Sequence, residues 1–225
     1  MQIVSLSFGK FPEISELDIF FIHSQLRLRL VLDIFLPEGK GFDFKNLYNK
    51  VTGLFPNLQR HKCWAHLLGG SVSQEQGEDS PFQSVGGVTD LAHLIEHIII
   101  DLQSTVGQMR TCSGLTCGYK EPANRFDLFV ECEDKRIATF SSNLAVKMMK
   151  ELLWEGSLIT DYTKTVQLAE YLYAEPELLS YIGRLNQKLG WDKEELCQQL
   201  RQLITFKFLT KELLVSNSGR KRGKK

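Results

Sequence analysis

The 225-residue chain lacks an apolar run long enough to cross a membrane. Its apolar runs are short, and the one at residues 94–100 is interrupted by Glu96 and His97, whereas a membrane-spanning helix needs about 20 mostly apolar residues. The N-terminus also lacks the basic segment followed by an apolar segment that is typical of a secretory signal. We therefore predict a protein with no membrane partner and a cytoplasmic location.

The chain also lacks net charge, since 27 basic side chains balance 27 acidic ones. Five of the basic residues lie within the last six positions, 220–225, so the rest of the chain is mildly acidic. This distribution argues against a general nucleic-acid-binding surface on the main domain. We interpret residues 216–225 as a disordered, solubilising basic tail, and contact of this tail with nucleic acid or an anionic partner is the alternative.

Regularly spaced cysteines are absent as well. The five cysteines are odd in number and irregular in spacing, at Cys63, Cys112, Cys117, Cys132 and Cys197. This pattern is typical of reduced intracellular thiols rather than of a disulfide framework. Cys112 and Cys117 are spaced for a zinc site, but the chain offers no second pair to complete it.

Residues 1–160 combine alternating segments with helical ones, as expected for a globular protein that is 43% apolar and 24% charged. Apolar and polar residues alternate over 25–36 and 125–133, which predicts strands with one buried face, and residues 1–8 favour a third strand. Helical spacing predicts helices at residues 42–55, 90–106 and 141–153. The predicted fold is α+β, with an antiparallel or mixed sheet packed by helices.

Only helices are predicted after residue 160, at 165–173, 176–189 and 192–204. We therefore divide the chain into an α+β domain (1–160), a small all-helical appendage (161–215) and the basic tail (216–225). The appendage has the helix, glycine turn, helix rhythm of a helix-turn-helix, which would bind DNA. Its second helix is not basic enough for a groove-binding element, so nucleic acid is not the favoured partner.

A polar, glycine- and serine-rich segment at residues 69–87 leads directly into the most informative helix. Thr89 or Asp90 is a suitable N-cap for it, and Gly107 is a suitable stop. His93, Glu96 and His97 are spaced i, i+3 and i+4, so their side chains share one helix face. Apolar residues cover most of the remaining circumference, which predicts a buried helix whose ionisable groups need partners.

The pattern H-x-x-E-H is that of the inverzincins, in which two histidines bind zinc and the glutamate activates the water. Imidazoles one helical turn apart can converge on a tetrahedral ion, and the glutamate beside the second histidine reaches the open position. Short patterns of this kind also occur by chance, so buried histidines with structural partners are the alternative interpretation.

Beyond this motif, residues 26–153 resemble the N-terminal domain of cyanophycin synthetases. The resemblance is carried by the strand from Leu28 to Asp33, the Leu54-Phe-Pro56 and His61-Lys-Cys63 segments, residues 91–103, and the segment from Phe129 to Asp134. It implies a domain that holds polymer substrate and, in some members, carries a metallopeptidase-like site similar to that of the pitrilysin group. The chain departs from the synthetases in having no ATP-grasp or Mur-ligase-like module and no glycine-rich phosphate loop.

The resemblance to the pitrilysin group also implies a third zinc ligand, a downstream glutamate. It points to Glu131, with Glu133 as the second choice on the same strand face, and a His2Glu set would leave one position for water. His61 and Cys63 are candidates for lining the site, and Arg110 and Arg125 for neutralising a substrate carboxylate.

The first functional hypothesis is a zinc-dependent peptidase-like domain that acts on a peptide or polymer. Zn2+ is held by His93, His97 and Glu131, and Glu96 is the general base. The competing hypothesis is a non-catalytic module that keeps the fold and binds a peptide or protein. The oligomeric state is left open.

Overall fold

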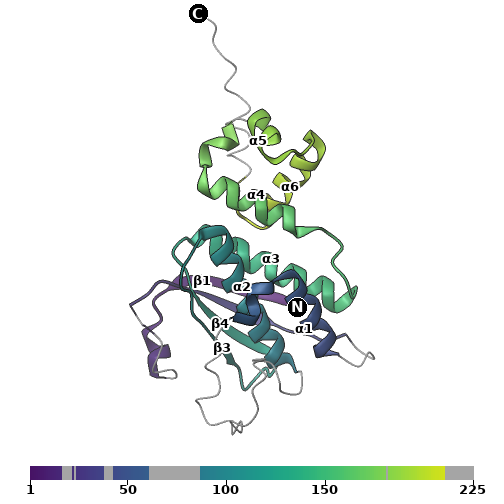
Figure 1. Ribbon diagram of the computed structural model, residues 1–225. Helices are drawn as coiled ribbons and strands as arrows, with labels where there is room; N and C mark the ends of the chain where they lie inside the picture. Colours follow the sequence, from purple (N-terminus) through teal and green to yellow (C-terminus); the bar gives the residue numbers. More distant parts are fainter. Residues whose placement is uncertain (17–21, 23, 38–42, 61–86, 181, 211–225) are drawn as a thin grey trace, which may run out of the picture.

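A four-stranded antiparallel sheet forms the base of the fold (Figure 1). The computed structural model describes residues 1–16, 22, 24–37, 43–60, 87–180 and 182–210. In spatial order the strands are β1 (Gln2–Gly9), β2 (Arg27–Asp33), β4 (Arg125–Glu131) and β3 (Gly114–Gly118). The α+β prediction is confirmed, with a sheet that is antiparallel throughout.

The alternation of side chains gives the sheet two different faces. Leu28 and Leu30 of β2 and Leu128 of β4 are fully buried in the main apolar core. Their neighbours in the chain point the other way, and Phe129 packs in a separate small cluster with Ile14. The register, in which Leu30 pairs with Leu128, keeps the apolar residues of both strands on one face.

Three helices contribute to the main apolar core on this side of the sheet (Figure 1). They are α1 (Phe44–Leu54), α2 (Val88–Gly107) and α3 (Lys135–Trp154). The central helix, α2, contacts β3 and β4 below it and α3 beside it. Its apolar residues are buried as predicted, and the helix ends at Gly107, where Gln108 follows in the left-handed conformation.

The predicted starts of α2 and α3 are wrong. Helix α2 begins at Val88, with Gly87 as N-cap, and Asp90 accepts a hydrogen bond from Gly87 N at 3.0 Å. An acidic residue can cap from the third helical position as well as from the N-cap, so Asp90 alone does not locate the start. Helix α3 begins at Lys135, capped by Asp134, before the predicted start at residue 141.

The segment 108–119, for which the sequence indicated no definite form, contains β3. It pairs with the predicted strand β4, and the two strands are antiparallel. β4 ends at Glu131, two residues before the predicted end. The predicted 69–87 segment lies outside the described residues, apart from Gly87.

The helical appendage packs on the α2 and α3 side of the domain (Figure 1). It consists of α4 (Tyr162–Ala174), α5 (Ile182–Leu189) and α6 (Lys193–Thr205), with a 3-10 turn (Pro176–Ser180) in place of the first part of the predicted second helix. The ring centroid of Phe140 in α3 lies 5.3 Å from that of Phe208, which follows α6. The appendage therefore shares the main apolar core rather than forming its own.

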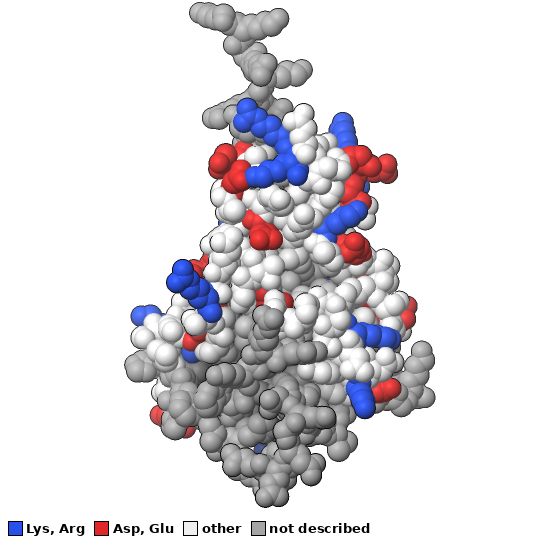
Figure 2. Space-filling view, in the orientation of Figure 1, with Lys and Arg blue, Asp and Glu red and all other residues white. Residues whose placement is uncertain are grey.

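The shorter turns complete the described part of the chain. Two 3-10 turns follow β1 and α1, at Pro12–Glu16 and Pro56–Arg60. None of the helices in the ranges that the structure describes is long and apolar enough to cross a membrane. Basic and acidic side chains are interspersed over the appendage on the face shown in Figure 2, so this face carries no extended basic surface.

Candidate metal centre

His93, Glu96 and His97 converge on one side of α2. His97 Nε2 lies 3.0 Å from His93 Nε2, and the nearest ligand atoms of all three residues lie within 4.8 Å of one another. Glu96 is 3% exposed and His97 4% exposed, whereas His93 is only partly buried. The structure therefore brings together the three residues of the motif, with His93 on the solvent side.

The distance between the imidazoles fits a zinc ion. Two nitrogens bound at about 2.0–2.1 Å in tetrahedral geometry lie about 3.3 Å apart, close to the observed 3.0 Å between the Nε2 atoms. Two imidazoles and a carboxylate are also donors that zinc accepts. The residues present fit the ion, and they leave a third protein ligand to be identified.

Glu96 is held by β3, which lies beneath this part of α2. The Thr116 hydroxyl donates a hydrogen bond to Glu96 Oε2. A Cβ at Gly114 would lie only 2.7 Å from Glu96 Cδ and 2.8 Å from Cγ, so a side chain at this position would displace the end of the Glu96 side chain. The sequence analysis did not predict a role for Thr116 or Gly114. The signal that could have indicated Thr116 is that a buried Glu96 carboxylate needs a hydrogen-bond donor.

Burial raises the pKa of Glu96 to about 7 in the metal-free protein, against the Thr116 hydrogen bond and the charge of Arg27, which lower it. Burial also raises the pKa of Asp101, one turn beyond His97, to about 6. The face of α2 that carries the motif is therefore a place where the fold disfavours negative charge.

Glu131, the predicted third ligand, is bound elsewhere. Its Oε1 accepts from Arg27 Nη2 at 3.0 Å and its Oε2 from the Ser113 backbone N–H at 3.0 Å. The alternation along β4 places Glu131 on the same face as Phe129, opposite to α2. The structure does not bring this carboxylate into the His93, Glu96 and His97 group, so its assignment as a ligand stays a prediction.

The second choice, Glu133, is exposed and follows the end of β4. The backbone carbonyl of Glu131, unlike its side chain, contacts α2, because Gln103 Nε2 of this helix donates a hydrogen bond to it at 3.0 Å. Cys112 Sγ donates to the same oxygen at 3.4 Å, and burial raises the pKa of this thiol far above its usual range. Cys112 packs against the main core and Cys117 against Phe129, so the two thiols belong to opposite faces of the sheet.

The remaining candidates do not join the site. Arg125 makes two hydrogen bonds to Asp33, at 2.7 and 2.9 Å, on the face away from α2. Arg110 is exposed. His61 and Cys63 lie outside the described residues.

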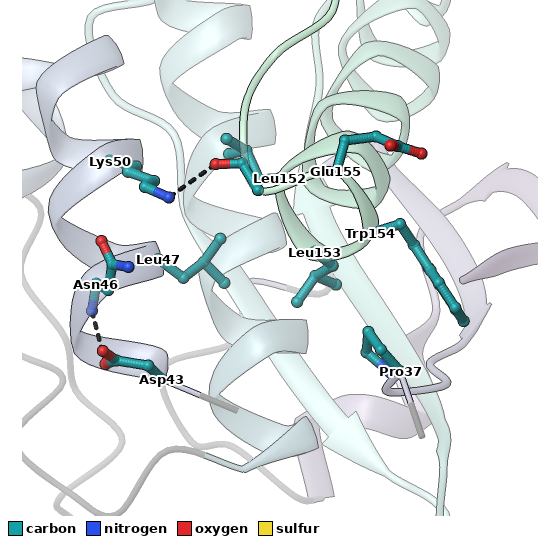
Figure 3. A pocket seen from close by; sticks show the side chains of 10 residues that line it. Pro37, Asp43, Asn46, Leu47, Lys50, Leu152, Leu153, Trp154 and Glu155 are labelled. Carbon is teal, nitrogen blue, oxygen red and sulfur yellow. Dashed lines mark hydrogen bonds between the residues drawn. The ribbon is translucent and has the colours of Figure 1, made fainter. Parts of the chain in front are cut away.

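A separate hollow of about 280 Å³ lies between α1 and the end of α3 (Figure 3). Its polar groups already serve the fold, because Lys50 Nζ donates to Gly156 O at 2.7 Å and the Asp43 carboxylate caps α1 through Asn46 N at 2.9 Å. None of the motif residues lines it. The candidate metal centre is therefore distinct from this hollow.

A comparison with protein families matches the part of the chain from β2 to the end of α3. The profile of the cyanophycin synthase-like N-terminal domain matches residues 27–154, more than half of the chain. The chain belongs to this family. The cyanophycin synthase-like match includes His93, Glu96, His97 and Glu131, and it leaves out β1 and the helical appendage. No curated protein matches the chain.

Proposed function

We propose that this cyanophycin synthase-like domain is a zinc-dependent metallohydrolase of the H-x-x-E-H type. The observation that supports the proposal most is the 3.0 Å approach of His93 Nε2 and His97 Nε2, with the Glu96 carboxylate in the same group of ligand atoms. Two facing imidazoles one helix turn apart are typical zinc ligands, and the glutamate beside them in this motif is the general base.

In this proposal His93 and His97 hold zinc, and Glu131 is the third ligand. When bound, zinc polarises the scissile carbonyl and acidifies the attacking water. Glu96 takes a proton from that water at the carboxylate oxygen that does not accept from Thr116, and it returns the proton to the leaving amine. For Glu131 to serve as a ligand, its carboxylate has to leave Arg27 and Ser113.

The proposed substrate is a peptide or isopeptide bond, in a cyanophycin-like polymer. The family supports this choice, since its name refers to enzymes that build such a polymer. The partly buried His93 is the member of the group nearest to solvent, and we propose that substrate approaches from this side.

Zinc content and polymer hydrolysis, measured on untagged protein, test the proposal. Wild type is expected to hold roughly one zinc ion per chain and to release small peptides from purified cyanophycin. Glu96→Gln keeps the zinc and loses hydrolysis by about 10²–10⁴-fold, the usual contribution of a general base. Equal hydrolysis by Glu96→Gln contradicts the mechanism, and wild type without zinc contradicts the proposal as a whole.

Three further variants separate the ligands from the base. His93→Ala is expected to lose the zinc, and Glu131→Gln, which replaces a proposed ligand, to weaken zinc binding by more than the roughly 10–100-fold that loss of a group supporting a ligand costs. Loss of zinc in Glu96→Gln, with full zinc in Glu131→Gln, would show that Glu96 is itself the third ligand. Arg125→Gln, on the other face of the sheet, serves as the control and keeps both zinc and hydrolysis.

One observation favours a second candidate, a non-catalytic module that binds the polymer or a peptide. Both carboxylate oxygens of Glu131 already accept hydrogen bonds, so the ligand set is incomplete as folded. This candidate predicts that wild type and Glu96→Gln sediment equally with insoluble cyanophycin and that neither releases peptides from it. If wild type releases peptides and Glu96→Gln does not, the non-catalytic module is excluded.

A further inference from the structure

The contacts of Glu96 come from the sheet rather than from its own helix. Thr116 is on the strand face that carries Gly114, and the register pairs these residues with Leu128 and Val130 of the core. The Thr116 hydroxyl donates to Glu96 Oε2. Because Glu96 is almost entirely buried, this hydroxyl takes the place of the water that an exposed carboxylate would bind.

Gly114 limits how the carboxylate can lie. A side chain at this position would overlap the end of Glu96, with a Cβ 2.7 Å from Cδ. The absence of a side chain therefore opens the space into which Glu96 extends, and the neighbouring Thr116 supplies the donor at the end of that space. Gly118, two residues beyond Thr116 on the same face, would place a Cβ 3.4 Å from a Phe126 ring atom and does not meet Glu96.

We infer that Thr116 is a positioning residue for Glu96 and that Gly114 provides the space in which the carboxylate is positioned. The inference deepens the proposed function and rests on it, since it assigns how the general base is aimed. A base must lie within about 2.6–3.2 Å of the group whose proton it takes. A glutamate side chain has several rotatable bonds, and one fixed donor at Oε2 orients the plane of the carboxylate and thus the direction of Oε1.

The test uses four variants of the full chain. Thr116→Val replaces the hydroxyl by a methyl group of similar size, and Thr116→Ser keeps the hydroxyl. Gly114→Ala displaces the carboxylate without removing the donor, and Gly118→Ala is the matched control on the same strand face. Zinc content, kcat and KM on purified cyanophycin are measured for each.

Thr116→Val and Gly114→Ala are expected to lower kcat by about 100-fold, the effect of a misplacement of about 1 Å. KM and zinc content stay at the wild-type values, because neither variant removes a metal ligand or a substrate contact. Thr116→Ser restores kcat to within a few-fold of wild type, and Gly118→Ala does not change it. Wild-type kcat in Thr116→Val overturns the inference, and so does a Thr116→Ser variant as slow as Thr116→Val.

A second measurement needs neither zinc nor substrate and so separates this inference from the proposed function. In metal-free protein, Thr116→Val is expected to lower the urea midpoint of unfolding in the wild-type background and much less in a Glu96→Ala background. Such coupling supports the contact even if wild type hydrolyses nothing. Equal shifts in both backgrounds show that the hydroxyl does not act through Glu96, and they overturn the inference even if wild type is an active hydrolase.

Discussion

The two faces of the sheet differ in how their ionisable side chains are paired. On the face covered by α2, three titratable groups meet at one point, and two of them, Glu96 and His97, are almost completely buried. On the other face, three arginines of β2 and β4 each pair with a carboxylate across the strands. The pairs are Arg27 with Glu131, Arg29 with Asp127, and Arg125 with Asp33.

The difference is the reason why we propose the metal centre on the face covered by α2. Charges that neutralise each other across strands stabilise a register and leave little capacity for a ligand. On the face covered by α2, the Glu96 carboxylate accepts from Thr116 and lies beside two imidazoles that face each other, and imidazoles and carboxylates are ligand types that zinc binds. Glu131 lies on the paired face and the histidines on the other, and this explains why the predicted ligand set is split between the two.

The largest expected effect comes from breaking the most buried pair. The Arg27 side chain is 1% exposed and that of Glu131 is 13% exposed. Arg27→Met therefore leaves the Glu131 carboxylate largely buried and without its charge partner. We expect a loss of about 3–5 kcal/mol in the free energy of unfolding, measured by urea denaturation. Glu131→Gln added to Arg27→Met should recover most of the loss, and a cost below about 1 kcal/mol for the single variant would contradict the comparison.

A smaller effect is expected from Glu96 on the other face, in metal-free protein. Its pKa of about 7 in the folded state lies above the ordinary 4.5, so the folded state binds the proton more tightly than the unfolded state does. The contribution of Glu96 to the free energy of unfolding is therefore fully present below about pH 4.5, and it is lost as the pH rises through 7. At pH 8 Glu96→Gln, which has no charge to bury, should be more stable than wild type by up to about 3 kcal/mol.

Urea denaturation of the two proteins between pH 4 and pH 8, with a chelator present, checks this expectation. The advantage of Glu96→Gln should be absent at the acidic end and grow with pH. Parallel stability curves would show that the Glu96 carboxylate is not disfavoured on this face, and the contrast between the faces would then fail. Glu155→Gln, at the end of α3 and away from the metal centre, is a suitable control.

The smallest effect is expected at the more exposed end of the paired face. Arg125 is 32% exposed and Asp33 15% exposed, so water screens this pair much more than Arg27 and Glu131. Arg125→Gln should cost at most about 1 kcal/mol, and the cost should shrink in about 1 M salt. A cost equal to that of Arg27→Met would show that burial does not rank the pairs.

Local periodicity was enough to predict much of this architecture. The helix that carries His93 and His97, the alternating strand of Leu28 and Leu30, and the three helices of the appendage were all predicted from spacing. The bounds of β3 were not predicted, because this strand is short and has glycine at both ends, Gly114 and Gly118, so its alternation is weak. The start of α3 was misplaced at residue 141 because serine, which stands at positions 141 and 142, suits an N-cap. In the structure both serines lie within the helix, and the Ser142 hydroxyl donates to Ala138 O at 2.8 Å.

The sequence by itself determined that His93, Glu96 and His97 share a helix face, because a period of 3.6 residues is a local property. It also contained the alternation that places Glu131 on the face of Phe129 rather than on that of the core leucines. Only the tertiary structure decided which side chains meet. Glu96 lies beside Thr116, and Glu131 beside Arg27, 104 residues away in the chain. Such contacts depend on how the sheet and helices pack, which no local period encodes.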